Sequence, residues 1–166
     1  MLETTTFLFQ NTTKRNHNCG EEYRVSSAAR QLYHSVRQQG LINRFVASFK
    51  GRRAAQRLID LNDFTGGRTS SARHYAGILT VCLSDIRGSV GRCDDFDADF
   101  HPLETNTEQR WLRVATARQD GLGLPPVQLI EVDGIYFLED GHHRVSVAWA
   151  RGQCEIEAEV TVWELA

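Results

Sequence analysis

The feature that most constrains this chain is a polar pentapeptide, Asp140-Gly141-His142-His143-Arg144, set between two apolar runs. It follows a strand-like run at 135–138 and precedes a helix-like run at 145–152. The first N–H groups of a helix lack partners and the helix dipole favours negative charge there, so this junction predicts an anion site. Arg144 adds a permanently charged fork, and the two imidazoles add donors that titrate near neutral pH. The alternative is an ordinary helix start, in which Asp140 caps the helix and the other residues are exposed.

The first half of the chain has the apolar spacing of helices. Apolar residues recur at i, i+3, i+4 and i+7, which predicts one helix over 26–39 and a second over 41–61. Gly40 is expected to stop the first helix, and Gly51 to break the second.

The second half alternates between strand-like and helix-like segments, which predicts an α+β fold with a small mixed sheet behind an N-terminal helical segment. The expected elements are a strand over 78–83, a loop over 84–99 with Phe96 turned inward, a helix from 104 or 105 that ends at Gly121, two strands over 127–132 and 135–138 joined by Asp133-Gly134, and a last strand over 156–163.

Length and composition exclude several classes of protein. A chain of 166 residues with 41% hydrophobic residues can bury a core without disulfides or metal. It has no apolar run long enough to cross a bilayer and no signal-peptide pattern at its start, so we expect a cytoplasmic protein without a membrane partner. None of the four cysteines forms a Cys-x-x-Cys pair, which argues against zinc and favours reduced thiols, several of them buried.

Charge is divided unequally along the chain. Residues 1–75 hold twelve Lys and Arg against five Asp and Glu, and residues 76–166 hold seven against sixteen. The Gly- and Ser-rich stretch 63–73 lies where the sign changes, so we predict a basic helical segment with its linker at 1–75 and a second domain at 76–166. A basic segment suggests nucleic-acid contact, and the alternatives are a helix that packs on the acidic half or docks a second subunit as a homodimer. The candidate contacts are Arg44, Lys50, Arg52, Arg53 and Arg57.

Four segments in the second half together resemble a known superfamily. They are Leu83-Ser84-Asp85-Ile86, Ser89-Val90-Gly91-Arg92, Pro125-Pro126-Val127 and the pentapeptide, with a helix and a hairpin between them. In this order they look like the ParB/sulfiredoxin superfamily over about residues 78–163. The resemblance implies a small mixed sheet whose polar motif, at a helix start, binds nucleotide phosphates.

Branches of the superfamily carry different versions of the motif. ParB proteins have Gly-Glu-Arg-Arg and bind CTP, and sulfiredoxins have Gly-Cys-His-Arg and use ATP. Free-serine kinases have Asp-Gly-His-Thr-Arg and use a nucleotide as phosphoryl donor, which is the nearest version to this chain. The sequence is also similar to uncharacterised bacterial ParB-like proteins with Asp-Gly-His-His-Arg or Asp-Gly-Asn-His-Arg.

The resemblance transfers to individual residues of the pentapeptide. Gly141 matches the glycine that lets the backbone approach a phosphate, and His143 and Arg144 match the His-Arg of sulfiredoxin. His142 stands where sulfiredoxin has its reactive cysteine, and an imidazole cannot replace a thiol in sulfinic acid repair. His142 and His143 also replace the Glu-Arg of ParB, whereas four of five positions, Asp140 included, match the serine kinases.

A second loop is expected at the same site. Ser89, Gly91 and Arg92 occupy the place of a phosphate-contacting loop in ParB-like domains, and Arg92 can bind phosphate through its fork. The alternative is that Arg92 pairs with Asp94 or Asp95 across a turn.

Acidic residues at 94–99 lack the glycine and closing glutamate of a calcium loop, so we interpret them as a polar loop. One of their carboxylates is a candidate to hold Mg²⁺ beside a nucleotide, but spacing selects none, and the metal ligands stay unknown. His101, before Pro102, is expected to be structural.

These observations lead to one expected function and two alternatives. We expect a ParB-like domain that binds a nucleotide with Mg²⁺, or another phosphorylated small molecule, and that associates with DNA in a nucleotide-dependent way. The first alternative is a phosphotransferase or nucleotide hydrolase resembling free-serine kinases, with Asp140, His142 and His143 as catalytic candidates. The second alternative is a non-catalytic interaction module.

Overall fold

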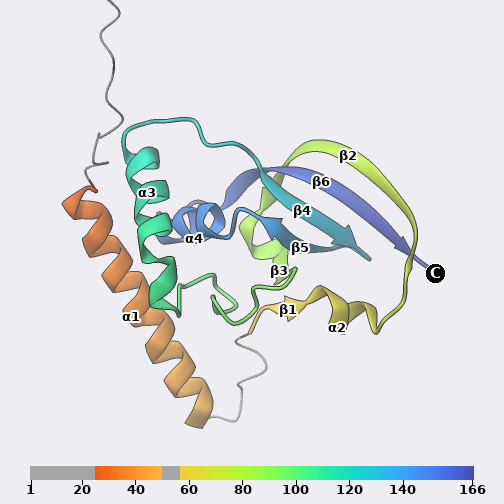
Figure 1. Cartoon of the computed structure of the whole chain (residues 1–166), viewed down its shortest axis with the longest axis horizontal. Coiled ribbons are helices and arrows are strands. Elements are labelled where there is room, and N and C mark those ends of the chain that lie inside the picture. The colour runs from red at the N-terminus through yellow and green to blue at the C-terminus, as the bar shows by residue number, and fades with distance from the viewer. Residues whose placement is uncertain (1–24, 50–56) are drawn as a thin grey trace, which may run out of the picture.

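A six-stranded mixed sheet lies at the centre of the computed structural model, which describes residues 25–49 and 57–166 (Figure 1). The strands are β1 (Ile59–Asp60), β2 (Ser70–Cys82), β3 (Ile86–Ser89), β4 (Val127–Val132), β5 (Ile135–Asp140) and β6 (Glu155–Leu165). Their order across the sheet is β1-β3-β5-β4-β6-β2. Neighbours β1, β3 and β5 run parallel, as do β4 and β6, whereas β4–β5 and β6–β2 are antiparallel. The predicted α+β class with a small mixed sheet is confirmed.

The helices are α1 (Ser27–Phe49), α2 (Leu61–Thr65), α3 (Glu108–Gln119) and α4 (His142–Ala150), with 3₁₀ turns at Leu83–Asp85 and Thr105–Thr107. Helices α1, α3 and α4 stack in layers on one side of the sheet, whereas α2 packs on the other face, against Phe137 (Figure 1). Helix α4 packs on β4 and β6, α3 packs on α4, and α1 packs on α3.

Two buried clusters hold these layers together. One lies between the sheet and α4 and includes Leu129 and Val145, and the other joins the helices through Tyr33, Trp111 and Val147. Trp111 also donates a 2.9 Å hydrogen bond from Nε1 to the buried Oγ of Ser146 on α4, so the start of α4 is fixed from both sides.

The N-terminal half differs from its prediction in two places. Helix α1 continues through Gly40 to Phe49 instead of stopping. A Cβ on Gly40 would lie 2.7 Å from Cβ of His101, so this glycine allows close packing against a loop rather than a helix end. The second predicted helix, over 41–61, is wrong at its end, since β1 occupies 59–60, and 50–56 lie outside the described residues.

The boundary drawn between residues 75 and 76 falls inside β2, which pairs with β6 from Ser70 to Cys82. The change of charge therefore does not coincide with an end of the sheet. Strand β3 was also missed, within the loop predicted over 84–99, because its four residues include Gly88, where a Cβ would clash with the ring of Phe137.

The hairpin and the junction after it are confirmed. Asp133 and Gly134, with φ of 51° and 80°, form the turn between β4 and β5. Strand β5 ends at Asp140 and α4 begins at His142, so the pentapeptide forms a strand-to-helix junction.

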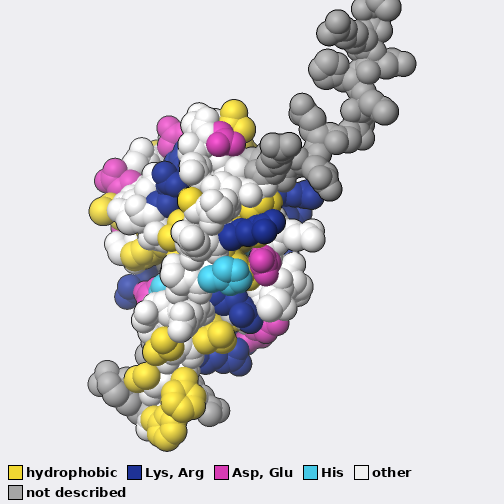
Figure 2. Space-filling view, turned by 90° about the vertical axis from the view of Figure 1, so that its left-hand side faces the viewer, with side chains coloured by type: hydrophobic (Ala, Val, Ile, Leu, Met, Phe, Trp, Pro, Cys, Tyr) yellow, Lys and Arg dark blue, Asp and Glu magenta, His cyan; other side chains and the backbone are white. Residues whose placement is uncertain are grey.

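Apolar side chains are exposed on the C-terminal half of α1, which is the hydrophobic group at the lower end of Figure 2. The exposed residues there are Leu41, Ile42, Phe45, Val46 and Phe49. In the described part of the chain, no helix combines the length and the apolar character needed to cross a bilayer.

Candidate functional site

The carboxyl ends of β3 and β5 meet at one edge of the sheet, because these neighbouring strands are parallel. Ser89 ends β3 and leads into the turn at Val90–Arg92, and Asp140 ends β5 and leads directly into α4. Crevices outside the carboxyl ends of parallel strands are the usual ligand sites of α/β sheets. The topology therefore places both sequence-predicted loops side by side.

Gly141 is fixed as glycine by two independent constraints. Its φ of 103° lies in the left-handed region, which side chains disfavour. A Cβ at this position would also lie 2.6 Å from Cγ1 of Val127 and 3.0 Å from Nε of Arg144. No side chain caps α4, and its first intrahelical acceptor, the Gly141 carbonyl, receives the N–H of Val145. The amides of residues 142–144 therefore begin the helix without the capping partner that Asp140 was expected to supply.

His142 is buried and bound to the end of β3. Its Nε2 lies 2.6 Å from Oγ of Ser89, whose side chain is fully buried. The ring of Phe96 stacks on this imidazole with centroids 5.9 Å apart. The contact with Ser89 ties the turn after β3 to the start of α4, which makes the two halves of the site one unit.

His143 is also buried, but its Nδ1 has no hydrogen-bond partner among the described residues. The same Phe96 ring meets it edge-on at 5.6 Å between centroids. A buried polar atom without a partner costs stability, so its presence at a helix start points to a functional role for this residue. The atom is enclosed by the surrounding protein and has no contact with solvent in this structure.

Both imidazoles are neutral at pH 7. Burial, together with the charge of Arg92, lowers the pKa of His142 and of His143 to about 4. Asp140 acts in the opposite direction on each, more weakly. Nε2 of the neutral His142 is occupied by its hydrogen bond with Ser89, and neither ring adds positive charge to the site.

Arg92 supplies the positive charge of the turn after β3. Its guanidinium is about 40% exposed, and Nε lies 3.7 Å from a carboxylate oxygen of Asp95. This long contact confirms the predicted pairing across the turn, and its geometry leaves donors on the guanidinium free to bind another anion. Gly91 beside it has a φ of 80° and open space around its Cα, so a ligand can approach the backbone there.

Arg144 does not take the place predicted for it. Its Nη1 donates to the carbonyl oxygens of Pro125 and Pro126, both at 2.6 Å, and its Nη2 lies 2.5 Å from Oδ2 of Asp140. Its side chain is only 14% exposed. The guanidinium therefore joins the start of β4 to the end of β5, and we leave Arg144 out of the ligand site.

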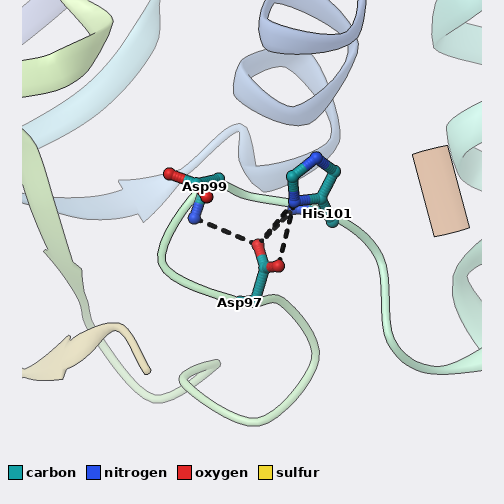
Figure 3. A group of neighbouring side chains, drawn as sticks. All are labelled: Asp97, Asp99 and His101. Carbon is teal, nitrogen blue, oxygen red and sulfur yellow. Dashed lines mark hydrogen bonds and ion pairs between the residues drawn. The ribbon is translucent and has the colours of Figure 1, made fainter. Parts of the chain in front are cut away.

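In the acidic loop at 94–99, the carboxylate of Asp97 is hydrogen-bonded to Asp99 and to the neighbouring His101 (Figure 3). Asp97 is buried, and its Oδ1 accepts the backbone N–H groups of Asp99 at 3.0 Å and His101 at 2.8 Å. Nδ1 of His101 lies 2.9 Å from Oδ2. Burial alone lowers the pKa of His101, but the hydrogen bond and charge of Asp97 outweigh it and raise that pKa above its ordinary value. His101 is structural in these contacts, as predicted, and the carboxylate of Asp97 is occupied by the loop's own donors.

Of the predicted nucleic-acid contacts, the structure describes Arg44 and Arg57, which lie beside one cavity. Arg57 forms an ion pair with Asp94 at 2.7 Å, and Arg44 lines, together with Arg57 and Phe96, a cavity of about 320 Å³. Lys50, Arg52 and Arg53 lie outside the described residues.

Cys93 is the buried thiol among the three described cysteines, whereas Cys82 and Cys154 are exposed, so the expectation of several buried thiols is wrong for this part of the chain. Burial, with Asp60 next to it, raises the pKa of Cys93 to about 11. This thiol is protonated at neutral pH and is a poor nucleophile.

The interactions of two residues, Phe96 and Arg110, with the histidines were missed by sequence reasoning. Phe96 was expected to turn inward, which is confirmed, but its contact with both imidazoles depends on the packing of a loop across α4. Arg110, on α3, adds to the charges that lower the pKa of His143. No local pattern links residues 96 and 110 to the pentapeptide.

Comparisons with known proteins give one structural similarity. No protein-family model and no curated protein matches the sequence. A crystal structure of sulfiredoxin from Arabidopsis thaliana is 26% identical, covers 50% of this chain and 82% of its own, and superimposes with a TM-score of 0.35.

Proposed function

We propose that this protein binds the phosphate groups of a nucleotide, or of another phosphorylated small molecule, between the start of α4 and the turn after β3. The observation that carries the proposal is the helix start at Gly141, which has no side-chain cap and tolerates no side chain of its own. Backbone amides at such a start point outward and favour an anion. The half-exposed Arg92 faces the same edge.

Each group has a distinct role in this proposal. The amides of residues 142–144 hold one phosphate, and Arg92 neutralises a second negative charge. Gly91 lets the ligand approach the turn, and Ser89 fixes that turn to α4 through His142. Magnesium would enter with the nucleotide, and Asp140, which is exposed and paired with Arg144 through Oδ2 alone, would offer it a carboxylate oxygen.

Calorimetry and thermal unfolding with a panel of nucleotides, with Mg²⁺ or with EDTA, test the proposal. We expect at least one nucleotide to raise Tm and to bind with a measurable Kd. Arg92→Gln should weaken binding about 10-fold or more, since a charged hydrogen bond is worth roughly 1.5–3 kcal/mol. Arg87→Gln is the matched control, because Arg87 is exposed on β3 and contacts the Ser84 carbonyl instead.

The outcomes separate this proposal from a non-catalytic interaction module. If no nucleotide and no inorganic phosphate changes Tm, the ligand site is refuted and the interaction module is favoured. Equal loss of affinity in the Arg87 and Arg92 variants would also contradict the assignment, because only one of these side chains faces the helix start.

A second candidate function is phosphoryl transfer to a small hydroxyl acceptor. It is favoured by the exposed carboxylate of Asp140 at the same edge, which is paired with Arg144 through Oδ2 and can take the acceptor's proton on Oδ1. Under this reading Asp140→Asn abolishes nucleotide consumption and keeps the binding measured in EDTA, which does not depend on Mg²⁺. The candidate fails if the wild-type chain consumes no nucleotide with a broad panel of acceptors.

A further inference from the structure

Strand β2 forms one edge of the sheet, and most of its residues are exposed to solvent. It is thirteen residues long and hydrogen-bonds to β6 on one side, while its other side has no neighbouring strand among the described residues. Ten of the residues between Ser71 and Cys82 are exposed. Free edges of this length offer a row of backbone donors and acceptors, and monomeric proteins usually shorten, charge or cover them.

Apolar side chains are exposed on both faces of β2. Ile78 is 58% and Leu79 40% exposed, and consecutive residues of a strand point to opposite faces of the sheet. Tyr75 adds a third large apolar side chain, 63% exposed. A partner that covered one face of the sheet would shield only one of Ile78 and Leu79. An added strand places side chains beside both, at the spacing of cross-strand pairs.

We propose that β2 pairs antiparallel with β2 of a second copy of this chain, so that the two sheets continue across a two-fold axis. The run from Tyr75 to Cys82 contains no charged residue, so self-pairing brings no like charges opposite each other. After the irregularity between Tyr75 and Gly77, the ladder with β6 is regular to Cys82. The regular part, Gly77–Cys82, has six residues, which is the usual length of a paired strand.

The polar side chains that precede this run have partners within each copy. The guanidinium of Arg73 lies 3.8 Å from the centroid of the Trp163 ring, and His74 lies 4.0 Å from Glu164. At the opposite edge of the sheet β1 has only two residues. Pairing through β2 therefore closes as a dimer, because the remaining edge is too short to continue the sheet.

Sedimentation and light scattering over about 10 μM to 1 mM test the pairing in the full chain. We expect the wild type to dimerise in this range and Ile78→Lys to raise the dissociation constant at least about 100-fold, since it sets like charges beside an apolar strand pair. The matched control is Leu122→Lys, which changes an apolar side chain of similar exposure, 53%, in the loop between α3 and β4 and not on β2. Both positions are exposed in one copy, so circular dichroism should show both variants folded.

Hydrogen exchange supplies an independent readout. Alternate amides within 77–82 should become protected with the concentration dependence of dimer formation, and this gain should be absent in Ile78→Lys. A wild type that stays monomeric at about 1 mM overturns the proposal, as does a dimer that Ile78→Lys leaves intact. A dimer dissociated by Phe49→Lys instead would place the interface on α1 and equally overturn it.

Discussion

The buried pair His142 and His143 predicts a specific acid sensitivity of the fold. Both imidazoles have a pKa of about 4 in the folded chain, against 6.5 for an ordinary histidine. Because the folded pKa is lowered, the unfolded chain binds protons first as pH falls, and stability is lost between about 6.5 and 4. At pH 5 this loss is about 2 kcal/mol for each imidazole relative to pH 7. About 4 kcal/mol for the pair is a large part of a typical 5–15 kcal/mol of folding stability.

Urea unfolding at pH 7, 6 and 5, followed by fluorescence, measures this loss in the free energy of unfolding. We expect His143→Leu to keep the fold at pH 7 and to reduce the loss between pH 7 and pH 5 by about 2 kcal/mol. His101→Gln should do the opposite. The raised pKa of His101 contributes stability that is fully present below its unfolded pKa and is lost as pH rises through its folded pKa, so its removal deepens the loss on acidification.

An identical pH dependence in the wild type and His143→Leu would refute this reasoning. So would imidazole NMR titrations that place both pKa values of residues 142 and 143 above 6 in the folded chain. Either result would mean that the rings are hydrated, and that Phe96 does not enclose them as the structure shows.

Three further substitutions have defined outcomes in urea unfolding. Gly141→Ala should destabilise by about 3 kcal/mol, because it combines a left-handed backbone with a Cβ pressed against Val127. Trp111→Phe should cost about 1–3 kcal/mol by leaving the buried hydroxyl of Ser146 without its donor. Arg144→Met should cost about 2 kcal/mol and loosen the start of β4, seen as faster amide exchange there, while leaving ligand affinity within about threefold.

The parts of the fold that the sequence predicted are those with a local cause. The turn at Asp133-Gly134 requires two left-handed residues, and the pentapeptide marks the end of an apolar run and the start of another. Both features depend on neighbours within a few residues. The α+β class follows from the alternation of strand-like and helix-like segments in the second half of the chain.

The parts that were missed depend on contacts between distant residues. Gly40 stops no helix, because the loop at His101 packs on it. Strand β2 gives no alternation signal over its first residues, since both of its faces are exposed. Arg144 is recruited by the carbonyls of Pro125 and Pro126, eighteen or more positions away.

The helix start at Gly141 is the centre of the account, and amide NMR tests it most directly. Titration of the ¹⁵N-labelled chain with the nucleotide selected by the panel, or with inorganic phosphate, reports on each backbone N–H separately. Phosphate bound as proposed shifts the amides of residues 142–144 and of Gly91 together, with one Kd, and Arg92→Gln weakens all four equally. Saturable shifts elsewhere, with the amides of residues 142–144 unchanged, would contradict the account.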